Sequence, residues 1–129
     1  MAPGDVTLPT ASELEILRVL WTRGPSTVRE VYRTIVAERA IGYSTVLKFM
    51  QIMTDKGLLV RDETVRPQRY RTAQPQQRTQ RSMLRDLVTR AFGGSAASLV
   101  LQALSDRRST REERQQIRQL LDALERKTS

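Results

Sequence analysis

Residues 42–57 read GYSTVLKFMQIMTDKG, and this stretch carries most of the information about the fold. It is rich in small polar residues, contains a lysine, and ends in Gly57, the residue type that most often closes a helix. Residues 58–63 (LLVRDE) then predict a strand, and residues 68–72 (QRYRT) predict its partner across a turn that holds Arg66 and Pro67. A polar-faced helix followed by a basic hairpin is the order of a recognition helix and its wing.

Two helices are predicted before this segment. The first begins at Thr10, where Thr10 and Glu13 have the spacing of a capping box, and it ends at Gly24-Pro25. The second opens at Ser26 or Thr27, with Glu30 three residues after Thr27. Apolar residues recur at helical spacing in both: Leu14, Leu17, Leu20 and Trp21 in the first, and Val28, Val31, Tyr32 and Ile35 in the second.

The third helix is expected to have Ser44 as its cap, to turn Val46, Met50 and Met53 inward, and to end at Gly57. Three short helices and a hairpin predict a mainly α fold with a winged helix-turn-helix domain over residues 10–73. Residues 1–9 contain two prolines and a glycine without periodicity, and we expect a flexible N-terminal arm there.

Residues 74–129 are expected to form a helical dimerisation module. Helices are predicted from about Pro75, from Ser95 and, through a second Thr-x-x-Glu pattern, from Thr110. Three short helices with narrow apolar faces have too little bulk for a core of their own. A second copy of the chain is the simplest partner, and an intramolecular core is the alternative. The expected interface residues are Leu84, Leu87, Val88, Ala91, Leu101, Leu104, Ile117, Leu120, Leu121 and Leu124.

The net charge of +8 favours polyanionic partners, because Lys and Arg side chains that contact phosphates release counterions. A membrane surface would also attract such a chain. Residues 1–72 carry eleven basic and eight acidic side chains, whereas residues 73–129 carry eleven and six. The basic excess is therefore not concentrated in the half that is expected to read DNA.

The 129 residues contain neither cysteine nor histidine. This excludes disulfides, thiolate metal sites and imidazole acid-base catalysis, and we expect no enzyme activity, no cofactor and no metal. No apolar run approaches the roughly 18 residues of a spanning helix, and the amino terminus lacks a basic segment followed by an apolar run. We expect a soluble cytoplasmic protein.

The outward face of the third helix supplies the candidate DNA contacts. Hydroxyls, a lysine and an amide there are groups that bind phosphates and base edges, and arginines in the wing suit phosphate or minor-groove contact. Arg61 and Arg71 belong to the same basic cluster of the wing. The expected DNA-binding residues are Tyr43, Ser44, Thr45, Leu47, Lys48, Gln51, Arg66 and Arg69.

The alternative reading of this surface is a solvated polar face. In that case the winged helix would be a protein-protein interaction module whose basic surface docks an acidic partner without specific DNA binding. The hairpin favours DNA binding, since a basic wing after a glycine-ended helix is not needed for solubility.

Five short motifs resemble the penicillinase-repressor family of bacterial transcription factors, the BlaI/MecI/CopY type. They lie between about Leu8 and Leu124 and comprise LEILRVLW (residues 14–21), STVREV (26–31), YSTV (43–46), KGLL (56–59) and the Arg69-Tyr70 pair. The resemblance implies a homodimeric repressor with an N-terminal winged helix, a C-terminal dimerisation module and an inverted-repeat operator in double-stranded DNA. It also implies that Ser44, Thr45 and Lys48 face the DNA.

The chain departs from the family pattern in three places. Ile52-Met53 stands where the family usually has arginine and leucine, and Lys48 stands where threonine is common. In the β-lactam-responsive members, a sensor-linked protease pathway leads to cleavage at an Asn-Phe bond, whereas the aligned residues here are Gln102-Ala103. The copper-responsive members use a cysteine-rich metal site, which a chain without cysteine cannot form.

Overall fold

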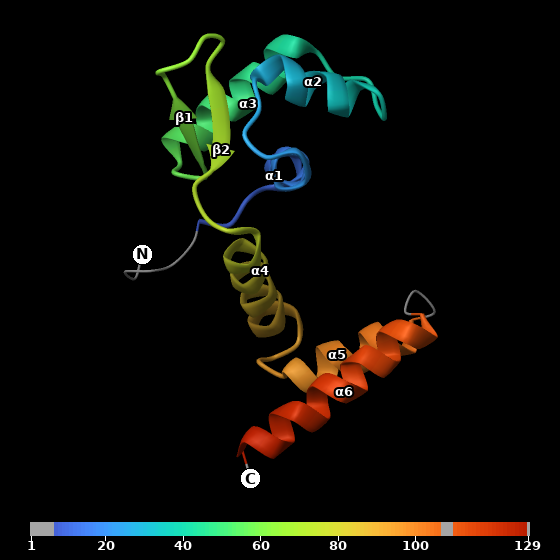
Figure 1. Cartoon of the computed structure of the whole chain (residues 1–129). Helices are drawn as coiled ribbons and strands as arrows, with labels where there is room; N and C mark the ends of the chain where they lie inside the picture. Colours follow the sequence, from blue (N-terminus) through green and yellow to red (C-terminus); the bar gives the residue numbers. More distant parts are fainter. Residues whose placement is uncertain (1–6, 107–109, 129) are drawn as a thin grey trace. The chain divides into compact units, whose positions relative to one another are not determined.

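The computed structural model describes residues 7–106 and 110–128, so residues 1–6 of the expected N-terminal arm lie outside its described part. The chain divides into two compact units, Met1–Leu84 and Arg85–Ser129. The elements are labelled in Figure 1, and their order is α1 (Ala11–Arg23), α2 (Val28–Val36), α3 (Tyr43–Asp55), β1 (Leu59–Asp62), β2 (Arg69–Thr72), α4 (Gln76–Ala91), α5 (Ala96–Ser105) and α6 (Arg111–Thr128).

Complete capping boxes begin α1 and α2, as the sequence predicts. The Thr10 hydroxyl accepts the Glu13 N–H at 3.2 Å, and the Thr10 N–H donates to the Glu13 carboxylate at 2.9 Å. Thr27 and Glu30 repeat the arrangement at 3.1 and 2.9 Å. Each box satisfies amides that the first helical turn leaves without partners. Gly24, with φ of 83°, closes α1 at the predicted place.

The expected cap of α3 is wrong. The helix begins at Tyr43, its N-cap is Gly42, and no side chain caps it, so Ser44 is already the second helical residue. The first helical residue also makes a contact outside α3, since the Tyr43 ring packs edge-to-face on Tyr32 of α2 with centroids 5.7 Å apart. The predicted end is confirmed, since Gly57 follows the C-cap residue with φ of 83°.

The predicted hairpin is confirmed, with both strands slightly shorter than expected. β1 and β2 pair antiparallel, and Arg61 lies opposite Tyr70. Ser26, just before α2, adds a third strand-like position: its N–H donates to the Tyr70 carbonyl at 3.0 Å and its carbonyl accepts the Tyr70 N–H at 2.8 Å. These two bonds attach the wing to the start of the helix-turn-helix.

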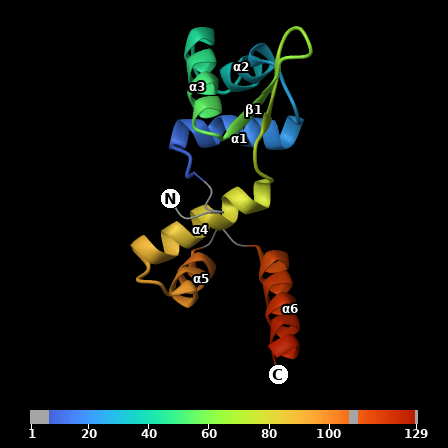
Figure 2. The same cartoon turned by 90° about the vertical axis from the view of Figure 1, so that its left-hand side faces the viewer.

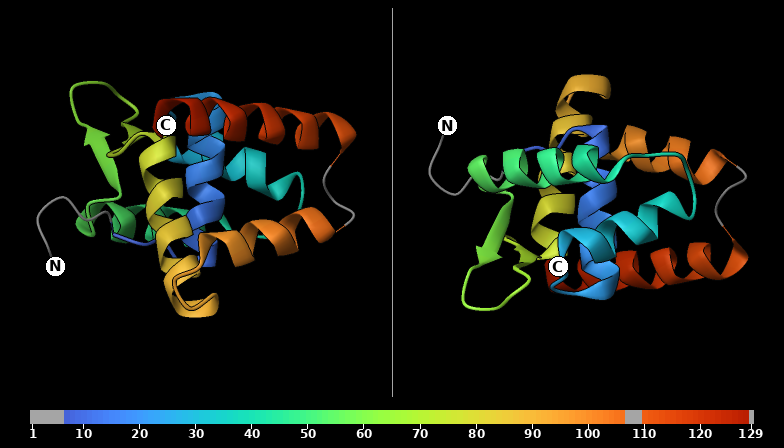
Figure 3. Two further views of the ribbon diagram at one scale, coloured as in Figure 1. Left: turned by 90° about the horizontal axis from the view of Figure 1, so that it is seen from below. Right: turned by 90° about the horizontal axis from the view of Figure 1, so that it is seen from above.

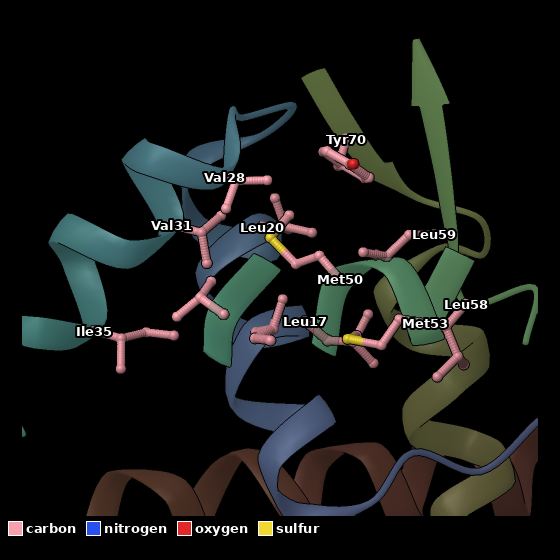
Figure 4. Packing of buried hydrophobic residues seen from close by; sticks show 12 residues of the cluster. Leu17, Leu20, Val28, Val31, Ile35, Met50, Met53, Leu58, Leu59 and Tyr70 are labelled. Atoms are coloured by element: carbon pink, nitrogen blue, oxygen red, sulfur yellow. The ribbon is translucent and has the colours of Figure 1, made fainter. Parts of the chain in front are cut away.

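Three helices and the hairpin share one core. Figure 4 shows the side chains of Met50 and Met53 among those of Leu17, Leu20 and Leu59. In Figure 2 the hairpin lies beside α2 and α3, with α1 beneath them. Among the described residues, the buried apolar side chains all fall between Ile16 and Tyr70. The core therefore belongs to the winged-helix part of the chain.

The C-terminal helices begin where the sequence predicts. The Ser95 hydroxyl accepts the Ser98 N–H at 3.1 Å at the start of α5, and the Thr110 hydroxyl accepts the Glu113 N–H at 3.1 Å at the start of α6. The first turns of α4 belong to unit 1, where Thr79 is buried.

The apolar faces of the predicted dimer interface are uncovered in the single chain. Leu101 is 65% exposed, Leu120 is 59% exposed and Leu124 is 51% exposed. Leu84, Leu87, Ala91 and Leu121 are also exposed, whereas Val88, Leu104 and Ile117 are half-buried.

Candidate nucleic-acid interface

The outward face of α3 presents polar side chains from Ser44 to Gln51. Ser44, Lys48 and Gln51 follow one another at intervals of four and three residues, so they share one face, and Thr45 lies beside Ser44. All four are exposed, and Lys48 makes no ion pair with any residue that the structure describes. The opposite face anchors the helix through fully buried side chains: Val46, Met50 and Met53.

Two other predicted DNA contacts, Leu47 and Tyr43, pack against other side chains of the same unit. Leu47 is half-buried and packs against the core, so little of it remains on the polar face. Tyr43 is 38% exposed, and its ring contacts Tyr32 and the guanidinium of Arg29, which lies 5.2 Å from the ring centroid. Tyr43 therefore links α3 to α2 while remaining at the surface.

The amino end of α3 is open to a ligand. Because Gly42 has no side chain to cap the helix, no side chain in the described part of the chain caps the amides of the first turn. The hydroxyls of Ser44 and Thr45 are not used for capping either. Amides, hydroxyls and the helix dipole at such a terminus together favour a negatively charged oxygen.

The strand register sorts the wing arginines onto two faces. Side chains of paired residues in an antiparallel hairpin lie on the same face, and this face alternates along each strand. Arg61 pairs with the buried Tyr70 and so lies on the inner face. Arg69 and Arg71 pair with Asp62 and Val60 on the outer, exposed face.

Arg61 is engaged within the wing itself. Its guanidinium contacts a Glu63 carboxylate oxygen at 3.1 Å, and interactions with Tyr70 and Glu63 raise the pKa of Arg61. Arg66 is exposed in the turn. Arg66, Arg69 and Arg71 thus remain as the wing cations without an ion pair among the described residues.

Two further basic side chains of unit 1 form ion pairs with carboxylates. Arg23 bonds Glu30 at 3.1 Å, and Arg39 contacts Glu15 through two guanidinium nitrogens at 2.7 to 3.1 Å. The hydrogen bond from Arg39 lowers the pKa of Glu15 below its ordinary value. The pKa of Glu30 is also lowered, and the main cause is the hydrogen bond from the Thr27 backbone N–H. The charge of Arg69 adds to the lowering of the Glu30 pKa, in agreement with the backbone hydrogen bonds that attach the wing to Ser26 just before α2.

These contacts bring the expected elements together on one side of unit 1. The right-hand view of Figure 3 shows α2 and α3 in front of α1 with the hairpin beside them. The sequence did not indicate two parts of this arrangement, the Ser26 anchor and Arg29. Arg29 lies between the two capping-box residues of α2, Thr27 and Glu30, and outside the apolar stripe, but no local signal connects it with Tyr43.

No group of three or more Asp and Glu side chains within residues 7–106 and 110–128 is arranged to hold a metal ion. Within the same residues, no single helix is long and apolar enough to cross a membrane, and only α4 and α5 taken together as a bent pair have the required length and composition.

Comparison with solved structures shows the fold. A MarR family protein from Bacillus stearothermophilus is similar over 94% of this chain and 76% of that one, with a TM-score of 0.51 and 17% identity. A mutant of Lactococcus lactis ZitR is similar over 100% of this chain and 81% of its own, with a TM-score of 0.46 and 17% identity. A structure of reduced AbfR bound to DNA is similar over 94% of this chain and 75% of that one, with a TM-score of 0.44 and 16% identity.

No curated protein matches the sequence. The family described as penicillinase repressor matches residues 9–123, nearly the whole chain, and this span includes the winged helix with its exposed α3 face and most of the C-terminal helices. The chain therefore belongs to the penicillinase repressor family and is a DNA-binding transcriptional regulator of the winged-helix type.

Proposed function

We propose that the chain is a homodimeric repressor that binds a palindromic operator and acts in the cytoplasm. Each copy inserts α3 into one of two major grooves about one helical turn apart, and its wing follows the flanking backbone. The observation that carries this proposal is the unpaired polar face of α3 beside a wing that backbone hydrogen bonds attach to Ser26.

Each side chain on this face has a suitable partner in DNA. Gln51 pairs with an adenine edge, and Lys48 donates to a guanine edge or to a phosphate. Ser44 and Thr45 bind phosphates near the open end of α3. Tyr43 and Leu47 border this face, while Arg66 and Arg69 bind the backbone from the wing.

The C-terminal helices support the dimer. The exposed leucines of α4, α5 and α6 would be costly to leave in water, and burial of apolar surface contributes about 25 cal/mol per Å². A two-fold dimer buries the same face of both copies and relates the two α3 helices by a dyad. A DNA site that matches this symmetry is an inverted repeat.

The direct test is a gel-shift titration of the full chain against the DNA upstream of its own gene, with unrelated DNA of equal length as competitor. We expect sequence-selective retardation that weakens as salt rises. Binding that is equal on both DNAs, or none, would favour the alternative of an interaction module for an acidic protein partner.

We also propose that proteolysis ends repression in response to a signal such as a β-lactam, through a sensor-linked protease. Gln102 and Ala103 are both exposed in α5, at the position aligned with the family's cleavage site. Mass spectrometry of the protein after exposure of cells to a β-lactam should find a fragment that ends at or near Gln102. Loss of repression with an intact chain would contradict this mode of release.

A further inference from the structure

Arg29 of α2 lies over the ring of Tyr43, the first residue of α3. The guanidinium carbon is 5.2 Å from the ring centroid, and Tyr32 meets the same ring edge-to-face at 5.7 Å and 79°. Tyr32 is half-buried, while Arg29 is exposed and Tyr43 is 38% exposed. A cation and two aromatic rings thus form a surface cluster that joins the start of the recognition helix to α2.

The ring restricts the position of a side chain that would otherwise be free. An arginine held over an aromatic face is attracted by the negative electrostatic potential of that face, while its N–H groups remain available at the edge. Arg29 makes no ion pair with any described residue. In contrast, Arg23 and Arg39 of the same unit are neutralised by carboxylates at 3.1 and 2.7 Å.

The location of the Arg29 charge also indicates which kind of group it can bind. Tyr43 immediately precedes Ser44 and Thr45, so Arg29 lies at the end of α3 where the helix begins. A planar guanidinium in a restricted position matches the geometry of a phosphate group, which it can bind through two parallel hydrogen bonds.

We propose that Arg29 is a phosphate-binding residue of the operator interface and that Tyr43 is a positioning residue that acts through it. The inference rests on the proposed function and deepens it, because it gives the Tyr43 ring a role that does not require contact with a base. Arg29 then contributes affinity without sequence preference, since a phosphate contact is the same at every base pair.

The test compares full-length variants on a short labelled duplex that the wild-type chain selects from a randomised library. The Arg29→Ala variant should bind about tenfold more weakly. Its log affinity should also fall less steeply with log salt, by about 1 in slope per half-site. Tyr43→Phe keeps the ring and should therefore keep the part of the salt slope that Arg29 contributes. Tyr43→Ala loses the ring and should lose part of the affinity and slope that Arg29→Ala loses.

Two controls separate this role from a general loss of charge or fold. Arg18→Ala removes the same charge from the exposed side of α1 and should leave both affinity and slope close to wild type. In the double variant Arg29→Ala/Tyr43→Ala, the two losses should not add, because the ring has no arginine left to orient. Thermal unfolding checks that each variant is folded.

The outcomes distinguish this inference from the proposed function. If the wild-type chain selects no duplex, the proposed function fails. If the wild type binds selectively but Arg29→Ala keeps the full salt slope, only the inference fails. An Arg29→Ala defect that appears at one base position alone also overturns it, because that pattern marks a residue that reads a base.

Discussion

Lys56 donates hydrogen bonds to both carboxylate oxygens of Glu13, at 2.7 and 2.9 Å, and so joins the end of α3 to the start of α1. Glu13 is 3% exposed and also accepts the Thr10 N–H. A buried carboxylate needs such partners, because its desolvation is costly. The same side chain thus caps one helix and holds the C-terminal end of the recognition helix.

Removal of Lys56 should leave this carboxylate buried without its counter-charge. We expect Lys56→Met to lower the free energy of unfolding by about 2 kcal/mol, less than for a fully buried pair because the Lys56 side chain is 34% exposed. Urea unfolding measures this loss. Lys48→Met makes the same substitution at an exposed, unpaired lysine and should stay within about 0.5 kcal/mol of wild type. Equal stability of all three chains would contradict the structural role of the pair.

The pair also predicts a dependence of stability on pH. Burial raises the pKa of Glu13, but the hydrogen bond from Lys56 and the Thr10 amide outweigh burial, and the net pKa lies below its ordinary value of 4.5. A lowered folded-state pKa gives stability that is present above the unfolded-state value and is lost as pH falls through the folded-state value. The stability advantage of wild type over Glu13→Gln should therefore shrink as pH falls below about 4.5. An advantage that grows with acid would contradict the sign of this shift.

Gly42 allows stability and DNA binding to be separated. Its φ is −90°, and a Cβ there would meet only Thr45 Oγ1 at 3.8 Å, so a side chain fits. Gly42→Ser and Gly42→Asp both add a side-chain cap and should keep or raise stability by a few tenths of a kcal/mol, measured by thermal unfolding. In a gel shift, Gly42→Asp should bind more weakly than Gly42→Ser, because its carboxylate repels a phosphate at the end of α3. Equal binding by both variants would argue against a phosphate there.

Lys48 is the most direct probe of the α3 face. Lys48→Ala should weaken binding to the selected operator by about 1–3 kcal/mol if the ammonium contacts a base edge, with the largest loss at one base position. Contact with a phosphate instead predicts a uniform loss across operator variants and a salt slope lower by about 1. Unchanged affinity and slope in a fluorescence-anisotropy titration would remove Lys48 from the interface.

The apolar face of α6 should control assembly. Leu120→Asp together with Leu124→Asp places two charges on the exposed leucine face and should give a monomer with a folded N-terminal unit in sedimentation velocity. Gln115→Asp with Gln119→Asp adds the same two charges on the opposite, exposed face of α6 and should remain dimeric. An intact dimer in the double-aspartate variant would contradict the proposed interface.

Local rules predicted much of the fold correctly. Both capping boxes, the glycine that ends α1 and the glycine that ends α3 depend on residues within a few positions of one another. The cap of α3 was predicted wrongly, since Gly42 and not Ser44 is the N-cap, and the contacts of Tyr43 with Tyr32 and Arg29 in another helix have no local signal. The Lys56–Glu13 pair joins residues 43 positions apart and has no local signal.

The same distinction applies to the candidate site. Helical periodicity predicted which α3 side chains face outward, because the buried set at Val46, Met50 and Met53 fixes the opposite face. It did not indicate which cations are neutralised by carboxylates. The pairing of Arg39 with Glu15, 24 positions apart, and the position of Arg29 over the Tyr43 ring depend on tertiary contacts.

A hydroxyl-radical footprint of the full chain on its selected duplex tests the central claim most directly. We predict two protected half-sites related by a dyad, with centres about one helical turn (roughly 10 base pairs) apart, and protection of the flanking backbone by the wing. A single protected half-site, or uniform cleavage along the duplex at saturating protein, would contradict a dimer that reads an inverted repeat through α3.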